Sequence, residues 1–124
     1  MANIKTTLQI LATSAFTDAN NTEIYPTDIS ITTNNDSILK RVKLEADVGK
    51  LIFESAEYGR SFLYLRMIGG RTDDRINIED SSSNTIYASL LSNEFAFIPW
   101  NGTVDLYAES VGAEGTIEVG IFEI

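Results

Sequence analysis

The chain has neither cysteine nor histidine among its 124 residues. Without cysteine it can form no disulfide framework, no thiolate metal site and no cysteine nucleophile. Without histidine it lacks the commonest general base of enzymes and the commonest ligand of transition metals. We therefore expect a protein that is not an enzyme and that holds no metal ion or cofactor.

Positive charge is also scarce, with 9 Lys and Arg against 18 Asp and Glu and a net charge of −9. Such a field repels phosphate backbones, so a nucleic-acid partner is not expected. Apolar runs are too short to cross a membrane, and the first ten residues lack the pattern of a signal peptide. We therefore expect synthesis in a cytoplasm and no membrane partner. Acidity also keeps a protein soluble at high local copy number.

Alternation of apolar and polar residues with a period of two recurs along the chain, whereas helical periodicity is almost absent. The hydrophobic fraction of 44% excludes disorder, and the length suits a single domain over residues 1–124. We expect an all-β fold, an antiparallel β-sandwich of jelly-roll type with about 8–10 strands. An immunoglobulin-like sandwich is the alternative.

Three segments predict which side chains face the core. Residues 60–67 turn Leu63, Leu65 and Met67 inward and Phe62, Tyr64 and Arg66 outward. In the closing segment, residues 116–124, one face carries Ile117, Val119 and Ile121, and the other carries Gly120, Phe122 and Ile124. The longest candidate strand, Ser37 to Val48, has an apolar face that Lys40 interrupts, formed by Ile38, Val42, Leu44, Ala46 and Val48.

The strongest turn signal is Asn101–Gly102, because a type I′ hairpin turn needs positive φ at both central residues. A two-residue hairpin here would pair the flanking segments and form a core face from Phe95, Phe97, Pro99, Val104, Leu106 and Ala108. The opposite face would carry Ala96, Ile98, Trp100, Thr103, Asp105 and Tyr107. Gly69–Gly70 predicts a second hairpin that pairs Arg66 with Asp73, Tyr64 with Arg75 and Leu63 with Ile76.

Acidic residues are the remaining candidates for chemistry, at Asp73–Asp74, Glu79–Asp80 and Asp105. None shows the alternating oxygen-ligand spacing of a calcium loop, and turns routinely recruit aspartate. A hydrolase would need two carboxylates about 5–10 Å apart in a cleft. The serines at 81–83 have no histidine to activate them. We interpret these side chains as solvated turn residues.

Two groups of side chains are candidates for binding. Arg41 and Lys43 share one side of a strand and can bind phosphate or an acidic neighbour, although a solvated strand face is the more common explanation for such a pair. Trp100 and Tyr107, with Ile98 between them on the predicted hairpin face, can stack on sugars or anchor a protein interface. The alternative is that these rings pack beneath a loop or the N-terminal segment.

Part of the chain resembles a known class of proteins. The run Asn-Glu-Phe-Ala-Phe-Ile-Pro-Trp-Asn-Gly at 93–102, Val-Asp-Leu-Tyr at 104–107 and Glu-Val-Gly-Ile-Phe-Glu at 118–123 carry the likeness. These runs resemble small virion structural proteins of tailed double-stranded DNA phages, in particular short all-β proteins encoded near capsid genes in marine and cyanobacterial phages. The resemblance implies a β-sandwich that coats a capsid as a decoration or cement protein, often as a trimer.

We therefore expect a virion protein, made in the host cytoplasm, that binds the outer capsid surface and stabilises adjacent capsomers. Its partners would be the major capsid protein and further copies in a homotrimer. Expected interface residues are Ile98, Trp100, Tyr107, Phe122 and Ile124, and expected capsid contacts are Arg41 and Lys43. The alternative is a receptor- or carbohydrate-binding module of a tail or head fibre, with Trp100 and Tyr107 flanking a groove lined by Asp105.

Overall fold

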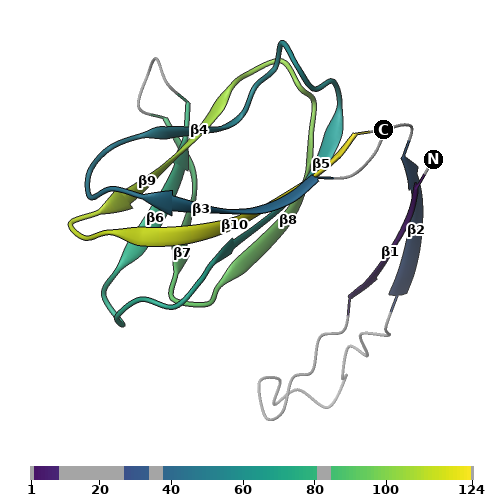
Figure 1. Cartoon of the computed structure of the whole chain (residues 1–124). Helices are drawn as coiled ribbons and strands as arrows, with labels where there is room; N and C mark the ends of the chain where they lie inside the picture. The colour runs from purple at the N-terminus through teal and green to yellow at the C-terminus, as the bar shows by residue number, and fades with distance from the viewer. Residues whose placement is uncertain (1, 9–26, 34–37, 81–84, 124) are drawn as a thin grey trace, which may run out of the picture.

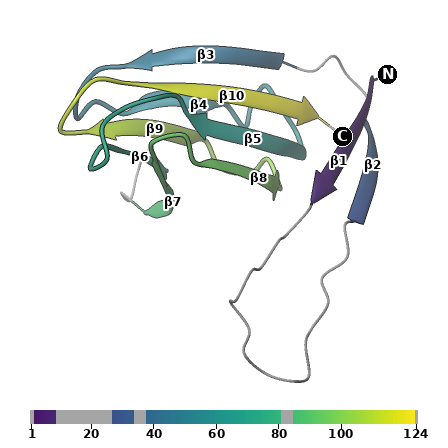
Figure 2. The same ribbon diagram turned by 90° about the horizontal axis from the view of Figure 1, so that it is seen from below.

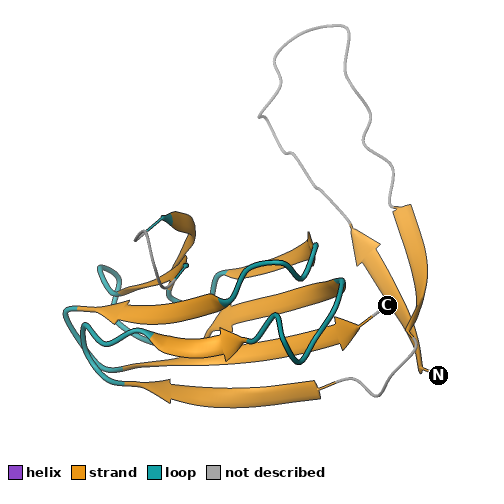
Figure 3. Cartoon of the chain, turned by 90° about the horizontal axis from the view of Figure 1, so that it is seen from above, coloured by secondary structure: helices purple, strands orange, loops and turns teal. Residues whose placement is uncertain are grey.

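The computed structural model describes residues 2–8, 27–33, 38–80 and 85–123. Figure 3 shows only strands and loops over these ranges, which include no helix of the length and apolarity needed to span a bilayer. The strands are β1 (Ala2–Leu8), β2 (Thr27–Thr33), β3 (Ile38–Leu44), β4 (Lys50–Phe53), β5 (Ser61–Met67), β6 (Arg75–Glu79), β7 (Ile86–Leu91), β8 (Phe95–Trp100), β9 (Leu106–Val111) and β10 (Gly115–Glu123).

These strands form three antiparallel sheets. β1 and β2 make a two-stranded sheet of their own, with Ala2 opposite Thr33 and Leu8 opposite Thr27. The first sheet has the order β3-β10-β5-β8, and the second sheet has the order β4-β9-β6-β7. Figures 1 and 2 show the two four-stranded sheets as the two layers of a sandwich.

The strand order is that of a jelly roll. Within the two four-stranded sheets, β6 and β7 are the one pair of chain neighbours that also pair in a sheet. Every other connection from β3 to β10 carries the chain from one sheet to the other. The predicted all-β jelly-roll sandwich is therefore confirmed, and this strand order differs from that of an immunoglobulin domain.

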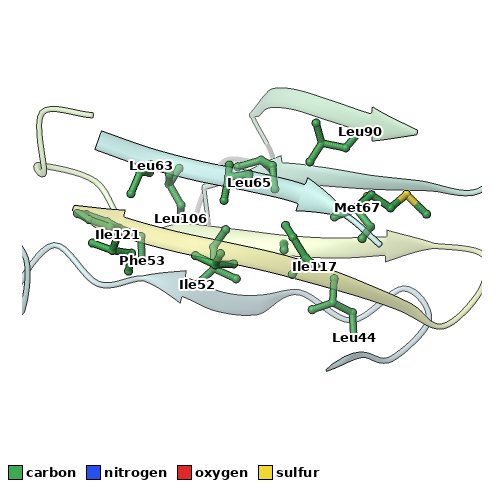
Figure 4. Close-up of a cluster of buried hydrophobic side chains, with 14 residues drawn as sticks. Leu44, Ile52, Phe53, Leu63, Leu65, Met67, Leu90, Leu106, Ile117 and Ile121 are labelled. Atoms are coloured by element: carbon green, nitrogen blue, oxygen red, sulfur yellow. The ribbon is translucent and has the colours of Figure 1, made fainter. Parts of the chain in front are cut away.

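The core lies between the sheets and follows the predicted alternation in β5 and β10. Leu63, Leu65 and Ile117 are fully buried, and Figure 4 shows their side chains in one cluster with Leu106 of β9. The buried apolar residues are Leu44, Ile52, Phe53, Leu63, Leu65, Met67, Ile76, Ile78, Leu90, Leu106, Ala108, Ile117, Val119 and Ile121. Burial of this set drives the two sheets together.

The predicted hairpin at Asn101–Gly102 is wrong. β8 pairs with β5 in the first sheet, whereas β9 pairs with β4 and β6 in the second. Gly102 has a φ of 80°, but Asn101 is not among the residues with positive φ, so no type I′ turn forms. The Asn101 side chain instead accepts hydrogen bonds from the Thr103 amide and hydroxyl. The turn signal thus marks a crossing between sheets.

The faces assigned to the two arms of that hairpin are corrected as well. Phe95 is 68% exposed and Val104 is 37% exposed, although both were expected in the core. Pro99 is also exposed, and Phe97 lies on the outer side of its sheet, opposite Tyr64. Leu106 and Ala108 are fully buried, as predicted. Because both faces of β8 are rich in apolar residues, alternation alone did not decide which face turns inward.

Two further expectations fail for related reasons. The Gly69–Gly70 hairpin does not form, because β5 and β6 belong to different sheets. The cross-strand pairs predicted for this hairpin therefore do not form. Leu63 and Ile76 both belong to the buried core, but they do not pair across strands. The strand expected from Ser37 to Val48 ends at Leu44, so that Val48 lies in a loop and is 50% exposed.

Candidate functional site

The outer face of the first sheet carries a cluster of aromatic side chains, which we call the aromatic face. It consists of Phe62 and Tyr64 from β5, Phe95 and Phe97 from β8, and Phe122 from β10. The sheet register sets them side by side, because Phe62 pairs with Phe122 on one side and Tyr64 pairs with Phe97 on the other. The rings of Phe62 and Phe97 are stacked with centroids 5.5 Å apart, and Phe122 follows at 6.3 Å from Phe97.

Gly120 makes room for this arrangement at the centre of the sheet. It lies in β10 between Tyr64 of β5 and Leu39 of β3. A Cβ atom at this position would lie 3.0 Å from the Phe122 ring and 3.2 Å from the Tyr64 Cβ. The absence of a side chain therefore lets the Phe122 ring lie over the β10 backbone, where it is half-buried and joins the other rings.

Polar and charged groups border the rings on the side of β3. The Glu118 carboxylate accepts hydrogen bonds of 3.1 Å from Arg41 Nε and from the Tyr64 hydroxyl. These bonds, first that from Arg41 and then that from Tyr64, lower the pKa of Glu118 below its ordinary value. The carboxylate therefore stays ionised and holds the Tyr64 ring in one orientation.

Arg66 lies next to these groups and is available for a ligand. A shallow, open hollow of about 430 Å³ is lined by Tyr64, Arg66, Asn93 and Phe95. Within the described ranges, no hydrogen bond or ion pair involves the Arg66 guanidinium, although its charge contributes to lowering the pKa of Glu118. A half-buried guanidinium beside exposed rings can bind a carboxylate, a carbonyl or another aromatic ring.

Of the predicted site residues, three lie on or next to the aromatic face. Phe122 belongs to it, and Arg41 and Lys43 project from β3 on the same side of the sheet. Both cations are exposed, and Arg41 forms the ion pair with Glu118. The face thus combines rings with Arg41, Lys43 and Arg66, and with Glu118 as a counter-charge for Arg41, so it carries an excess of positive charge on a chain whose net charge is −9.

The other predicted site residues lie elsewhere. Ile98 and Trp100 turn to the opposite side of β8 and pack against the core. The Trp100 ring meets Tyr87 edge-on at 5.4 Å, and its Nε1 donates to the Val104 carbonyl. Tyr107 is half-buried on the outer face of the second sheet, and Ile124 lies outside the described residues. Trp100 and Tyr107 therefore do not flank a common groove.

Two of the acidic candidates, Asp74 and Asp105, have structural roles in turns. Asp105 accepts hydrogen bonds from the Ser55 amide and hydroxyl, which lower its pKa. Asp74 accepts a hydrogen bond from the Arg71 amide. In the part of the chain that the structure describes, no group of three or more acidic, histidine or cysteine side chains is placed to hold a metal ion. These contacts agree with the interpretation of Asp74 and Asp105 as turn residues.

The interpretation of Glu79 as a solvated turn residue is wrong, because it lies at the end of β6 and forms a buried acidic pair on the outer face of the second sheet. Glu79 of β6 is buried to 9% exposure beside Glu109 of β9. Burial, a hydrogen bond with Glu109 and the negative charges of Glu109 and Asp80 raise the pKa of Glu79. A raised pKa means that the folded chain holds this proton more tightly than the unfolded chain.

Glu79→Gln should therefore stabilise the protein at pH 7 but not at pH 4. Glu79 lowers stability as pH rises from its unfolded pKa through its higher folded pKa, because the folded chain must then ionise a buried carboxyl. The glutamine amide can still donate to Glu109 without adding charge, and the gain should be about 1 kcal/mol, the size of one like-charge contact. Urea unfolding of the wild type and the variant at pH 7 and pH 4 measures this gain in stability. An equal difference in stability at the two pH values would refute this role of Glu79.

Four residues of the aromatic face were absent from the predicted interface, namely Phe62, Tyr64, Phe95 and Phe97. A usable signal existed for Phe62 and Tyr64, since the alternation in residues 60–67 already predicted that they point outward. For Phe95 and Phe97 the signal failed, because the hairpin assigned them to the core. Their position depends on the pairing of β8 with β5, which are distant in sequence.

Comparison with known proteins shows no family for this chain. No protein-family model matches the sequence, and no curated protein matches it significantly. The structure of protein NMB1881 from Neisseria meningitidis is similar with 14% identity and a TM-score of 0.46, over 74% of this chain and 81% of that one. A chain of the Bacillus endospore appendages, described as disulfide-linked pili, has 14% identity and a TM-score of 0.43, over 79% and 99%.

Proposed function

We propose that the protein is a non-enzymatic structural protein of a phage particle, which decorates the capsid and attaches to it through the aromatic face. The observation that carries this proposal is the cluster of five rings on the outer side of the first sheet, with Phe95 68% exposed. Contiguous apolar surface of this kind on a soluble protein marks an interaction site.

The chemistry of the aromatic face suits a protein partner. Aromatic residues and arginine are the residue types enriched at the energetic centres of protein interfaces. Arg41, Lys43 and Arg66 border the rings on one side and complement an acidic partner surface. Residues 93–107 and 118–123 resemble small virion proteins, and on this ground we propose the capsid as the partner. The clamping of adjacent capsomers is part of the same proposal, whereas the homotrimer stays a prediction from the resemblance.

The protein composition of purified phage particles tests this proposed function. Particles of the phage whose genome encodes the chain, purified on a density gradient, should contain it at a copy number comparable to that of the capsomers. Immunogold labelling should place it on the head. Its absence from purified particles would refute the proposal, and labelling confined to the tail would favour a fibre module instead.

A saccharide ligand is the second candidate, and the hollow beside Arg66 favours it. Tyr64 and Phe95 offer ring faces on which a sugar can stack, while Arg66 and Asn93 offer planar polar groups for its hydroxyls. Retention on a glycan array that Arg66→Ala abolishes would support this function. A uniformly negative array, together with labelling of the head, would leave the capsid role as the better explanation.

A further inference from the structure

The two four-stranded sheets have four edge strands, β3 and β8 in the first and β4 and β7 in the second. An edge strand presents unpaired N–H and C=O groups on which another chain can add a strand. Soluble proteins protect such edges with charged side chains, proline, bulges or very short strands. The four edges of this sandwich differ in whether they carry such a device.

Three of the edges are protected. β3 carries Lys40, Arg41 and Lys43, which oppose pairing with a second cationic strand. β8 contains Pro99, which removes one N–H donor. β4 has only four residues and an irregular register between Leu51 and Phe53.

β7 is the exception. Its sequence, Ile-Tyr-Ala-Ser-Leu-Leu, contains no charged residue and no proline. Its one irregularity leaves Tyr87 without a residue of β6 opposite it, because Ile86 pairs with Glu79 and Ala88 pairs with Ile78. The side chains of Ile86 and Tyr87 are 52% and 44% exposed, and Leu91 is 43% exposed. Among the described residues, β7 pairs with β6 alone.

We propose that β7 pairs in antiparallel fashion with β7 of a second copy of this chain, across a two-fold axis. In such an isologous contact each strand meets its own sequence, so like charges would face each other on a charged strand. β7 itself carries no charged side chain, in contrast to β3, although the Asp80 and Glu94 carboxylates accept hydrogen bonds from Tyr87 and Leu91. The pairing would join the second sheets of two copies into one continuous eight-stranded sheet and would cover the exposed apolar side chains of β7.

The backbone groups of β7 that are open to a second strand determine the centre of this contact. The Glu94 carboxylate already accepts a hydrogen bond of 2.8 Å from the Leu91 amide, so the ladder open to a partner runs from Ile86 to Leu90. Its middle residue is Ala88, whose side chain packs against the core and therefore does not obstruct a strand added at this edge. With Ala88 opposite Ala88, the exposed Ile86 and Tyr87 of each copy lie opposite Leu90 and Ser89 of the other.

Sedimentation across a concentration series from about 1 μM to 1 mM tests the contact. The wild-type mass should rise from that of the 13.7 kDa chain toward twice this value. Ile86→Lys should raise the dissociation constant at least about tenfold, because each dimer then buries two unpaired charges. The matched control is Leu39→Lys on the β3 edge, which is 65% exposed and should leave association unchanged. Melting temperatures verify that both variants fold.

A cysteine substitution at Ala88 tests where the proposed two-fold axis lies. The chain has no cysteine, so any disulfide in Ala88→Cys must join two copies. Directly opposed residues of paired strands lie within disulfide reach, and we expect oxidation to give a covalent dimer far faster than in the exposed control Thr103→Cys. The proposal is overturned by a wild-type chain that stays monomeric or forms a trimer, by an Ile86→Lys variant that associates normally, or by equal cross-linking of the two cysteine variants.

Discussion

Gly102→Ala should destabilise the protein by roughly 2–5 kcal/mol, because an alanine would be both strained and overpacked at this position. The residue has a φ of 80°, which disfavours any side chain. A Cβ atom would also lie 2.5 Å from the carbonyl carbon of Gly59, which is backbone. Urea unfolding followed by tryptophan fluorescence, with Trp100 as the probe, measures the loss.

Gly112→Ala is the matched control for this prediction. Gly112 has a similar φ of 75°, but nothing lies within 4 Å of the position its Cβ would take. Its substitution should therefore cost only the conformational strain, about 1–2 kcal/mol. Equal losses in the two variants would show that the contact of the 101–105 crossing with the loop at Gly59 has no role in stability.

The second large effect is expected at Leu65 in the centre of the core. Leu65→Ala should lower the free energy of unfolding by about 2–5 kcal/mol, because the side chain is fully buried and its removal leaves a cavity between the sheets. Phe95→Ala removes a larger side chain that is 68% exposed and should cost less than about 1 kcal/mol. A larger loss at Phe95 than at Leu65 would mean that β8 turns its other face to the core.

The sequence predicted the strands themselves well. The segments at 60–67 and 116–124 were placed close to β5 and β10, and the inward sides of Leu65 and Val119 are confirmed. Alternation succeeds there because one face is uninterruptedly aliphatic or methionine, whereas Arg66, Glu118 and Gly120 interrupt the other. In this molecule the local residue pattern was sufficient to place the elements and to indicate a jelly-roll sandwich.

Strand pairing could not be predicted in the same way. Asn101–Gly102 and Gly69–Gly70 both suggested hairpins, because adjacent strands joined by two such residues usually pair. In a jelly roll most connections cross between sheets, so a turn signal says where the chain reverses and not which strand it pairs with. The error at Asn101–Gly102 placed Phe95 and Phe97 in the core and concealed the aromatic face.

The aromatic face therefore depends on contacts between residues distant in sequence. Phe97 stacks on Phe62 because β5 lies between β8 and β10 in the first sheet. Gly120, which no turn or motif singled out, gives the Phe122 ring its place beside them. The predicted cations Arg41 and Lys43 lie on the same side of the sheet, so the structure joins a predicted charged pair to rings that the sequence assigned elsewhere.

Binding of the purified protein to capsids stripped of their own copies tests most directly whether the aromatic face is the attachment surface. Phe95→Ala should raise the dissociation constant at least about tenfold, as expected for the most exposed aromatic side chain of the attachment surface. Val48→Ala, an equally simple truncation at a 50% exposed loop position, should bind as the wild type does. Wild-type affinity of the Phe95→Ala variant for these capsids would contradict the proposed attachment.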